Sequence, residues 1–156
     1  MGKKLIFLVA VVIIGGIVLS GCGQADQSQA GQGGDDGVTS QVIATEKTLP
    51  QDFYAQAEQG VLAHKVKDQE TFESQWAYFQ LEGTAPERNW ENEAVIFLGV
   101  IESGTCPYEI DSLQFNDDDS ELTVRFKTDP NKACTDDATP RTFVLAVDAE
   151  QAAQTE

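Results

Sequence analysis

Residues 94–101 read AVIFLGVI, and this stretch decides the fold because it contains no polar side chain. A strand with one solvated face alternates apolar and polar residues, whereas a strand covered on both faces is apolar along its whole length. We therefore expect residues 94–101 to form a central strand of a sheet, with other parts of the chain packed on each face.

The residues that follow this strand predict three more strands. Apolar side chains alternate with polar ones at 108–115, where the parity slips and predicts a β-bulge near 111–112. They alternate cleanly at 122–126, which is typical of a half-buried strand, and residues 142–147 are again apolar apart from Thr142. The intervening segments are polar or contain Gly or Pro, and they predict turns or loops at 102–107, 116–120 and 129–140.

The residues before the central strand predict two strands and one helix. Residues 52–57 and 61–67 are the strand candidates. The second candidate places three side chains on one face: Leu62, His64 and Val66. Asp68 has the character of a helix N-cap. The helix that follows carries an apolar stripe of Phe72, Trp76 and Phe79.

The order of these elements predicts the fold class. Successive strands joined by short turns favour an antiparallel meander, and the single helix can then cover one face. We expect an α+β fold, a mainly antiparallel β-sheet of about five to six strands with one helix packed on a face.

The N-terminus has the features of a secretory signal. Two lysines precede an apolar run at 5–19, and the run ends in Leu-Ser-Gly-Cys at 19–22. This ending resembles the lipobox of bacterial lipoproteins, and the resemblance implies cleavage before Cys22 and its lipidation. An uncleaved membrane helix is the alternative, because the run is close to the roughly 17 residues that a span requires. The expected location is the extracytoplasmic face of the cell membrane, with a lipid anchor at Cys22.

The chain divides into four expected parts. The signal peptide covers residues 1–21, and residues 22–45 comprise the lipidated Cys22 and a flexible tether rich in Gln, Gly, Ser and Asp. A single domain covers residues 46–148, and residues 149–156 are expected to be a disordered tail. We expect the domain to be monomeric.

The composition is strongly acidic. The chain has 26 acidic and 10 basic side chains, and loss of the signal peptide with its two lysines leaves 26 against 8, a net charge of −18. This charge excludes nucleic-acid binding, which requires a basic surface that displaces counterions. A solvated surface is the preferred explanation of the charge, and the alternatives are a cationic partner and a salty environment.

Two cysteines remain once Cys22 is assigned to the lipid. An even pair in an exported protein favours a disulfide between Cys106 and Cys134. The expected meander supports this pairing, because it places the turn at 102–107 and the loop at 129–140 at the same end of the sheet. A redox or metal site is the alternative, although the spacing is not Cys-x-x-Cys.

Several short sequence features follow one another in a characteristic order between residues 51 and 148. A strand and an acidic-capped helix with an aromatic stripe precede an apolar strand that ends in Gly-Val at 99–100; a Gly-rich turn then leads into Tyr-x-Ile at 104–110, and the last strand reads Pro-x-x-Phe-Val at 140–144. This layout resembles the PrcB-like family of exported and lipoprotein domains, named for an accessory subunit of a bacterial surface protease complex. The family's turn usually reads Gly-Gly-Tyr, whereas this chain has Cys-Pro-Tyr at 106–108. The resemblance implies a non-enzymatic accessory or binding domain.

The sequence predicts no catalytic group, no cofactor and no metal site. The single histidine, His64, lies on a strand with apolar neighbours, and we interpret it as a packed residue. The acidic run at 116–121 lacks the alternating ligands, central Gly and distal Glu of a calcium loop, so a solvated turn is favoured there. Pairs of carboxylates are uninformative in so acidic a chain.

Three kinds of function remain open. The preferred one is a non-enzymatic binding or accessory domain that meets an exported protein partner through Thr105, Pro107 and Tyr108 beside the disulfide, since tyrosine is a common interface anchor. One alternative is a sensor of a cation or small ligand. The other is a cell-envelope hydrolase of unrecognised type, which would need clustered carboxylates in a cleft.

Overall fold

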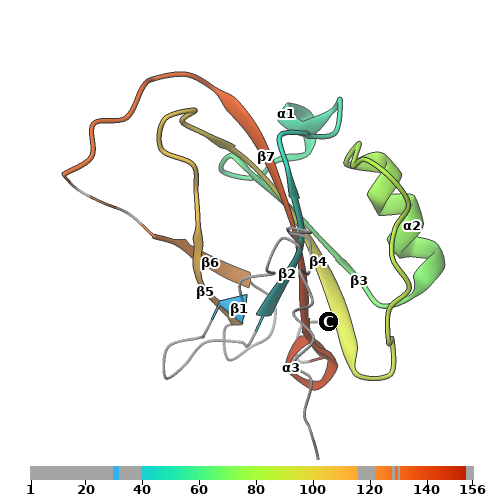
Figure 1. Cartoon of the computed structure of the whole chain (residues 1–156). Helices are drawn as coiled ribbons and strands as arrows, with labels where there is room; N and C mark the ends of the chain where they lie inside the picture. The colour runs from blue at the N-terminus through green and yellow to red at the C-terminus, as the bar shows by residue number, and fades with distance from the viewer. Residues whose placement is uncertain (1–29, 32–39, 116–121, 128, 130, 154–156) are drawn as a thin grey trace, which may run out of the picture.

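The computed structural model describes residues 30–31, 40–115, 122–127, 129 and 131–153. Within these ranges the chain forms a five-stranded sheet, a two-stranded ribbon and three short helices (Figure 1). The elements in chain order are β1 (Ala30–Gly31), β2 (Ser40–Glu46), α1 (Phe53–Gln56), β3 (Val61–Val66), α2 (Gln69–Tyr78), β4 (Glu93–Glu102), β5 (Ile110–Phe115), β6 (Leu122–Phe126), β7 (Thr139–Asp148) and α3 (Ala149–Ala153).

The predicted central strand is confirmed. β4 lies between β7 and β3 in a sheet of order β1-β2-β7-β4-β3, in which every neighbouring pair is antiparallel. Residues 94–100 of β4 are all buried. The α+β class with a mainly antiparallel sheet is therefore confirmed as well.

The two faces of the sheet carry separate apolar cores. Figure 1 shows α2 on one side of the sheet and the β5–β6 ribbon on the other. The buried residues on the helix side are Phe53, Leu62, Val66, Phe72, Trp76, Phe79, Leu81, Val95, Phe97 and Val144. The buried residues on the ribbon side are Ala94, Ile96, Leu98, Val100, Leu113, Phe143, Leu145, Val147 and Ala152. Alternate residues of β4 thus enter different cores, which is why the strand is apolar throughout.

The expected meander is wrong in its strand order. β4 pairs directly with β7, from Glu93 opposite Asp148 to Glu102 opposite Thr139, and β5 and β6 form a separate ribbon. The reason is burial. Both β4 and β7 are apolar along most of their length and need cover on each face, so they lie side by side in the sheet. β5 and β6 each have a polar face and serve as the cover on one side.

Two local predictions are confirmed. The register of β5 against β6 shifts between Ile110 and Ser112, which is the predicted bulge. Asp68 caps α2, because its carboxylate accepts hydrogen bonds from the backbone N–H and the hydroxyl of Thr71, both at 2.8 Å. These two hydrogen bonds hold the pKa of Asp68 below the ordinary carboxyl value of 3.8.

The strand expected at 52–57 is a short helix instead. Residues Phe53–Gln56 form α1, and the N–H of Ala57 donates to the carbonyl of Phe53 at 2.8 Å. Phe53 is buried in the helix-side core, whereas Tyr54 is 79% exposed. A single helical turn is therefore enough to bury the ring of Phe53, and unlike a strand it needs no neighbouring strand to pair with.

The sheet begins earlier than the expected domain boundary at residue 46. β2 pairs with β7, from Ser40 opposite Val147 to Glu46 opposite Thr142, and β1 pairs with the first residues of β2. The flexible tether predicted for residues 22–45 is therefore wrong over its C-terminal part. β2 contains both polar and apolar residues, and it forms a strand by pairing with the edge of β7.

The disordered tail expected at 149–156 begins with a helix. α3 follows β7 directly, and Ala152 is fully buried against the ribbon-side core. The side chain of Lys65 on β3 donates to the carbonyl of Ala152 at 3.0 Å, so a cation lies at the C-terminal end of this helix. Residues 154–156 lie outside the described part of the chain.

The described ranges contain no helix with the length and apolar character that crossing a membrane requires. The signal peptide predicted for residues 1–21 lies outside those ranges.

Candidate functional site

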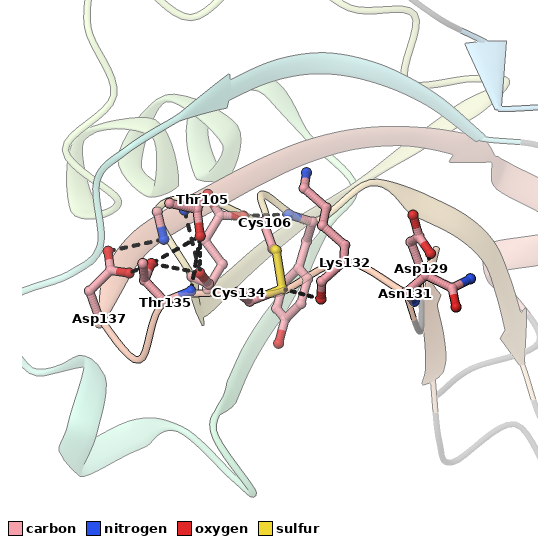
Figure 2. Close-up of a disulfide and its surroundings, with 12 residues drawn as sticks. Thr105, Cys106, Asp129, Asn131, Lys132, Cys134, Thr135 and Asp137 are labelled. Carbon is pink, nitrogen blue, oxygen red and sulfur yellow. Dashed lines mark hydrogen bonds between the residues drawn. A yellow bond between two sulfur atoms is a disulfide. The ribbon is translucent and has the colours of Figure 1, made fainter.

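The two cysteines of the domain meet at one end of the sheet. Glu102 at the end of β4 lies opposite Thr139 at the start of β7, so the loop that leaves β4 and the loop that enters β7 start side by side. Cys106 in the first loop and Cys134 in the second form a disulfide with a Cα–Cα distance of 5.5 Å (Figure 2). The predicted pair is confirmed, although the pairing of β4 with β7, and not a meander, brings it together.

We define the disulfide end as residues 103–108 together with residues 131–139. Side-chain hydrogen bonds join its two loops beside the disulfide. The N–H of Thr135 donates to Thr105 Oγ1 at 2.9 Å, and the two threonine hydroxyls lie 3.0 Å apart. The hydroxyl of Ser103 lies 3.1 Å from that of Thr135. The two loops therefore hold each other through polar contacts as well as through sulfur.

Asp137 accepts hydrogen bonds from both loops. Its Oδ2 accepts from the N–H of Gly104 at 3.0 Å and from the hydroxyl of Thr139 at 2.9 Å. Its Oδ1 accepts from the hydroxyl of Thr135. The hydrogen bonds from Thr135 and Thr139, together with that from Gly104, hold the pKa of Asp137 below the ordinary value of 3.8. The carboxylate is therefore ionised at neutral pH and acts as an acceptor for this end of the molecule.

The close approach of Asp137 and Thr139 leaves little room for a side chain at position 104. A Cβ atom at this position would lie 2.5 Å from Asp137 Oδ2 and 3.1 Å from Thr139 Oγ1. Such a contact would push the carboxylate away from its donors. The Gly of the predicted Gly-rich turn thus serves the packing of the two loops.

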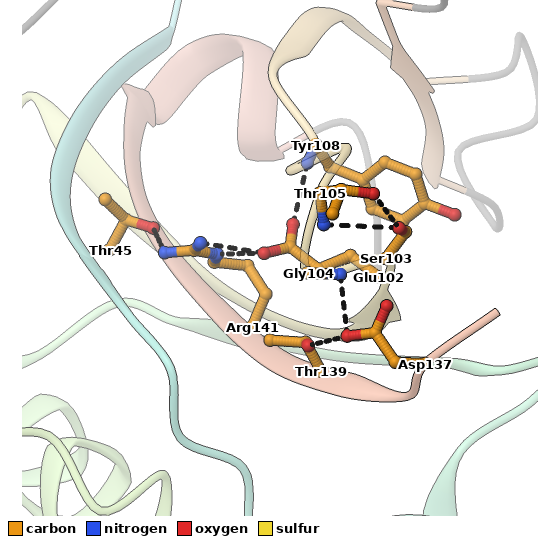
Figure 3. A network of polar contacts seen from close by, with 9 residues as sticks. All are labelled: Thr45, Glu102, Ser103, Gly104, Thr105, Tyr108, Asp137, Thr139 and Arg141. Carbon is orange, nitrogen blue, oxygen red and sulfur yellow. Dashed lines mark hydrogen bonds and ion pairs between the residues drawn. The ribbon is translucent and has the colours of Figure 1, made fainter. Parts of the chain in front are cut away.

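A buried ion pair supports the disulfide end from the sheet. Arg141 Nη2 and Nε lie 2.7 and 2.8 Å from Glu102 Oε1 (Figure 3). The other oxygen of Glu102 accepts from the backbone N–H of Tyr108 at 2.7 Å. Arg141 Nη1 lies 3.5 Å from Thr45 Oγ1 on β2. The ion pair between β4 and β7 is therefore connected to the first loop through Tyr108 and to β2 through Thr45.

The three residues predicted to bind a partner differ in exposure. Thr105 and Pro107 are exposed, whereas Tyr108 is half-buried. The ring of Tyr108 stacks on Phe126 with the ring centroids 4.5 Å apart, and it packs against the ribbon-side core. Thr105 and Pro107 can therefore meet a partner directly, while much of the Tyr108 ring is committed to holding the loop on the ribbon.

His64 lies in another part of the molecule, between β3 and α2. Its Nδ1 lies 2.7 Å from Oε1 of Gln75, and its ring stacks on Tyr78 with the centroids 5.6 Å apart. Desolvation raises the pKa of the Tyr78 hydroxyl, and the hydrogen bond that this hydroxyl donates to Asp52 raises it further. The surroundings of His64 are those of a side chain packed between a strand and a helix.

Two predictions about sites fall on residues that the structure does not describe. These are the lipidation of Cys22 and the solvated turn in the acidic run at 116–121. Among the residues that are described, no group of three or more His, Cys, Asp or Glu side chains is placed to hold a metal ion.

The sequence alone does not single out Asp137 or Arg141. Asp137 follows Asp136 in a polar loop, and nothing in the sequence distinguishes the two. Arg141 precedes one apolar strand and Glu102 follows another, so each carries a charge at the border of a buried segment. That signal indicates an ion pair only when the two strands are known to be neighbours.

Comparison of the whole chain with protein-family models, with curated proteins and with solved structures finds no match.

Proposed function

We propose that this chain is an extracytoplasmic lipoprotein, anchored through Cys22, whose domain binds an exported protein through the disulfide end. The role is that of a non-enzymatic binding or accessory domain. One observation carries the proposal: two exposed loops at one end of the sheet are joined by a disulfide and by side-chain hydrogen bonds.

Such an arrangement supports binding because the loops are ordered before a partner arrives. Immobilising a flexible side chain at an interface costs roughly 0.5–1.5 kcal/mol, and a preorganised surface avoids much of this cost. The exposed side chains of Thr105 and Pro107 lie on loops of this kind. Binding residues are common on loops that a rigid scaffold positions.

The chemistry of the chain narrows the kind of partner. A net charge of −16 for the whole chain favours a partner with a basic surface, and association should then weaken as salt is added. The resemblance to PrcB-like domains makes an exported protease the first candidate. The Cys-Pro pair at 106–107 departs from that family's glycine-based turn, so the surface presented to the partner differs as well.

A cross-linked pull-down of the full chain from native membranes tests the proposal. Pro107→Arg adds a long charged side chain to the exposed surface and leaves in place the hydroxyl and carboxylate groups that join the loops. Ser74→Arg adds the same side chain to the exposed side of α2, away from the disulfide end. We expect the unaltered chain and Ser74→Arg to enrich the same exported protein, and Pro107→Arg to lose it.

Two results would contradict the proposal in different ways. Equal recovery by all three chains would place the binding surface elsewhere on the domain. Recovery of no envelope protein by any of them would argue against an accessory role. The anchor is tested separately by fatty-acid labelling, which Cys22→Ala should abolish.

A further inference from the structure

The two cysteines of the disulfide differ in their access to solvent. Cys134 lies in a run of residues, 131–138, that are all exposed, whereas Cys106 is half-buried. Neither is among the described residues that are buried in the two apolar cores. Thiol–disulfide exchange requires a thiolate to reach one of the two sulfur atoms, so access decides where the exchange starts. Cys134 is therefore the open side of this disulfide.

The chain that follows the disulfide is held without the help of sulfur. The N–H of Thr135 donates to Thr105 Oγ1 at 2.9 Å, and Asp137 accepts from the N–H of Gly104 at 3.0 Å. The loop then enters β7, which is paired with β4. None of these contacts involves a sulfur atom, so this part of the chain should keep its place when the disulfide is reduced.

The chain that precedes the disulfide is held differently. At the end of the ribbon, the N–H of Lys127 donates to the carbonyl of the residue before β5 at 2.9 Å. Beyond it, the N–H groups of Asn131 and Lys132 donate to Oδ1 and to the carbonyl of Asp129, at 2.9 and 3.1 Å, within one turn. Among the residues that the structure describes in this stretch, Cys134 is the one that a bond joins to the other loop.

We define the tethered segment as residues 129 and 131–134. In Figure 2 its residues before the cysteine lie on one side of the disulfide, and Thr135 and Asp137 lie on the other. Cys106, to which the segment is tied, is followed directly by the exposed Pro107. Reduction would therefore release a segment beside the proposed binding surface, while the rest of the two loops stays joined.

The hydrogen bonds between the loops also determine which class of reductant is effective. They keep Cys106 close to Cys134, and the Cα atoms of the two are 5.5 Å apart in the disulfide. A monothiol that attacks Cys134 therefore gives a mixed disulfide that the neighbouring Cys106 thiolate converts back to the original bond. A dithiol completes the reduction, because its second thiol attacks its own sulfur in the mixed disulfide.

We propose that the Cys106–Cys134 disulfide is a site of reversible reduction by an exported protein dithiol, and that its reduction changes the surface offered to the binding partner. A thiolate of the dithiol attacks Cys134 Sγ and displaces Cys106 as a thiolate, which takes up a proton. The second thiolate of the dithiol then displaces Cys134, which is protonated in turn. The disulfide of this chain is reduced to two thiols, and the dithiol is oxidised to a disulfide. The effect on the partner rests on the proposed function, whereas the reduction does not.

Reduction of the folded chain tests the site. The full chain with Cys22→Ser, which retains only the two cysteines of the domain, is treated with dithiothreitol or with 2-mercaptoethanol at equal thiol concentration. We expect dithiothreitol to release both thiols without urea and with the circular dichroism unchanged, and oxidised dithiothreitol to restore the disulfide. Release of thiols only in urea, or loss of the native spectrum on reduction, would overturn the proposal.

The monothiol tests the preference for a dithiol. We expect 2-mercaptoethanol to release far fewer thiols than dithiothreitol from the folded chain, because Cys106 is held beside Cys134. In urea this cause is removed, so the deficit of 2-mercaptoethanol should shrink. An equal deficit in the folded and the unfolded chain would show that the hydrogen bonds between the loops do not select the reductant.

Limited digestion with trypsin tests the release of the tethered segment. Trypsin cleaves after Lys132, in the segment, and after Lys47, which is exposed in another part of the molecule. We expect reduction to speed cleavage after Lys132 by roughly tenfold or more and to leave cleavage after Lys47 unchanged. Equal acceleration at the two sites would indicate loosening of the whole domain, and no acceleration would mean that the segment stays in place. Either result would overturn the release.

A pull-down tests the effect on the partner. The chain with both Cys106→Ser and Cys134→Ser represents the reduced form, and we expect it to recover less of the exported protein than the unaltered chain does. Equal recovery would overturn the effect of reduction on the partner. Recovery by neither chain would contradict the proposed function, and with it that effect, while the results with dithiothreitol and trypsin would still decide whether the disulfide is a site of reduction.

Discussion

The carboxylate of Glu102, at the end of β4, lies 2.7 Å from the guanidinium of Arg141 on β7. The Glu102 side chain is 1% exposed and that of Arg141 is 14% exposed. The ribbon and both loops of the disulfide end separate these two residues in the sequence, so the pair forms only when β4 and β7 are neighbours. A charge buried this deeply depends on its counter-charge for compensation.

Arg141→Leu should lower the free energy of unfolding by about 3–5 kcal/mol, because it leaves the Glu102 carboxylate buried without a counter-charge. Arg141→Lys should lower it less, since a lysine retains the charge but not the contact through two nitrogen atoms. Urea unfolding followed by tryptophan fluorescence measures both changes.

The exposed pair of Lys127 and Glu109 provides the matched control. Their charged atoms lie 3.4 Å apart, and the side chains are 58% and 67% exposed. Lys127→Leu should therefore change the free energy of unfolding by no more than about 1 kcal/mol. A loss as large as that of Arg141→Leu would show that burial is not the cause.

The disulfide should contribute strongly to stability. Cys106 and Cys134 are 28 residues apart in sequence. Closing a loop of this length lowers the entropy of the unfolded state, and in the chain-entropy model this raises the free energy of unfolding by about 3–4 kcal/mol. The variant with both Cys106→Ser and Cys134→Ser should lose stability of this order in chemical unfolding. In a Cys22→Ser background the native chain should not react with a thiol reagent until reductant is added. Reaction without reductant would contradict the disulfide.

Gly104→Ala should disturb the joined loops without removing any polar group. Its Cβ would lie 2.5 Å from Asp137 Oδ2, so we expect the carboxylate to move away from its donors and its pKa to rise toward the ordinary value of 3.8. Carbon-detected NMR titration of the Asp137 carboxyl group measures this change. Thr139→Val removes one donor but adds no atom near Gly104, so it should raise the pKa while leaving the hydrogen bond from Gly104 in place. An unchanged pKa in Gly104→Ala would show that the loops adjust freely.

The stability of the domain should fall in acid. The folded-state pKa of Asp68 is lowered by its bonds to Thr71, and that of Asp137 by its bonds to Thr135 and Thr139. Because the unfolded chain binds protons more readily at both carboxyl groups, their contribution is present above the ordinary value of 3.8 and is lost as the pH falls through the lowered folded values.

Asp68→Asn tests one part of this pH dependence. Asparagine keeps an oxygen that can cap α2 but does not titrate. The melting temperature of the variant should therefore fall less steeply than that of the unaltered chain between pH values of about 5 and 2. Parallel curves for the two chains would mean that the Asp68 cap does not contribute to acid sensitivity.

Gly99 should tolerate no larger side chain without loss of stability. A Cβ atom there would lie 2.7 Å from Leu49 Cδ2 and 3.3 Å from Phe79 Cε1. Overpacking of this kind costs about 1–3 kcal/mol, so Gly99→Ala should be less stable by that amount. Combining it with Leu49→Ala removes the nearest atom, and the double variant should lose less than the sum of the two single losses. Simple additivity in chemical unfolding would point to another cause.

Much of the fold could be predicted from local pattern. The apolar stretches at 94–101 and 142–147 predict buried strands, and Asp68 followed by an aromatic stripe predicts α2 with its first residue. The parity slip predicts the bulge near Ile110. Local pattern does not predict β2 at 40–46 or the helical turn at 52–57. A mixed polar segment can pair as a strand or remain a linker, and one buried aromatic ring suits a strand or a turn of helix equally well.

The candidate site was only partly accessible from sequence. Cys106 and Cys134 are an obvious pair by number and by the expected export of the chain. Asp137, Glu102 and Arg141 depend on long-range contacts, and their residue types are common in so acidic a chain. The exposure of Pro107 and the partial burial of Tyr108 also required the position of Phe126 on the ribbon.

By itself the sequence determined which segments are buried on one face and which on both, where the main helix begins, and which two cysteines could pair. These properties follow from side-chain chemistry and from the periods of helix and strand. Only the tertiary structure decided that β7 lies beside β4, that β5 and β6 leave the sheet as a ribbon, and that the chain enters at the end opposite the disulfide. The physical reason is that several segments, far apart in sequence, could pair with the same strand edges and cover the same apolar faces. Which of them does so depends on how the whole domain buries its apolar side chains.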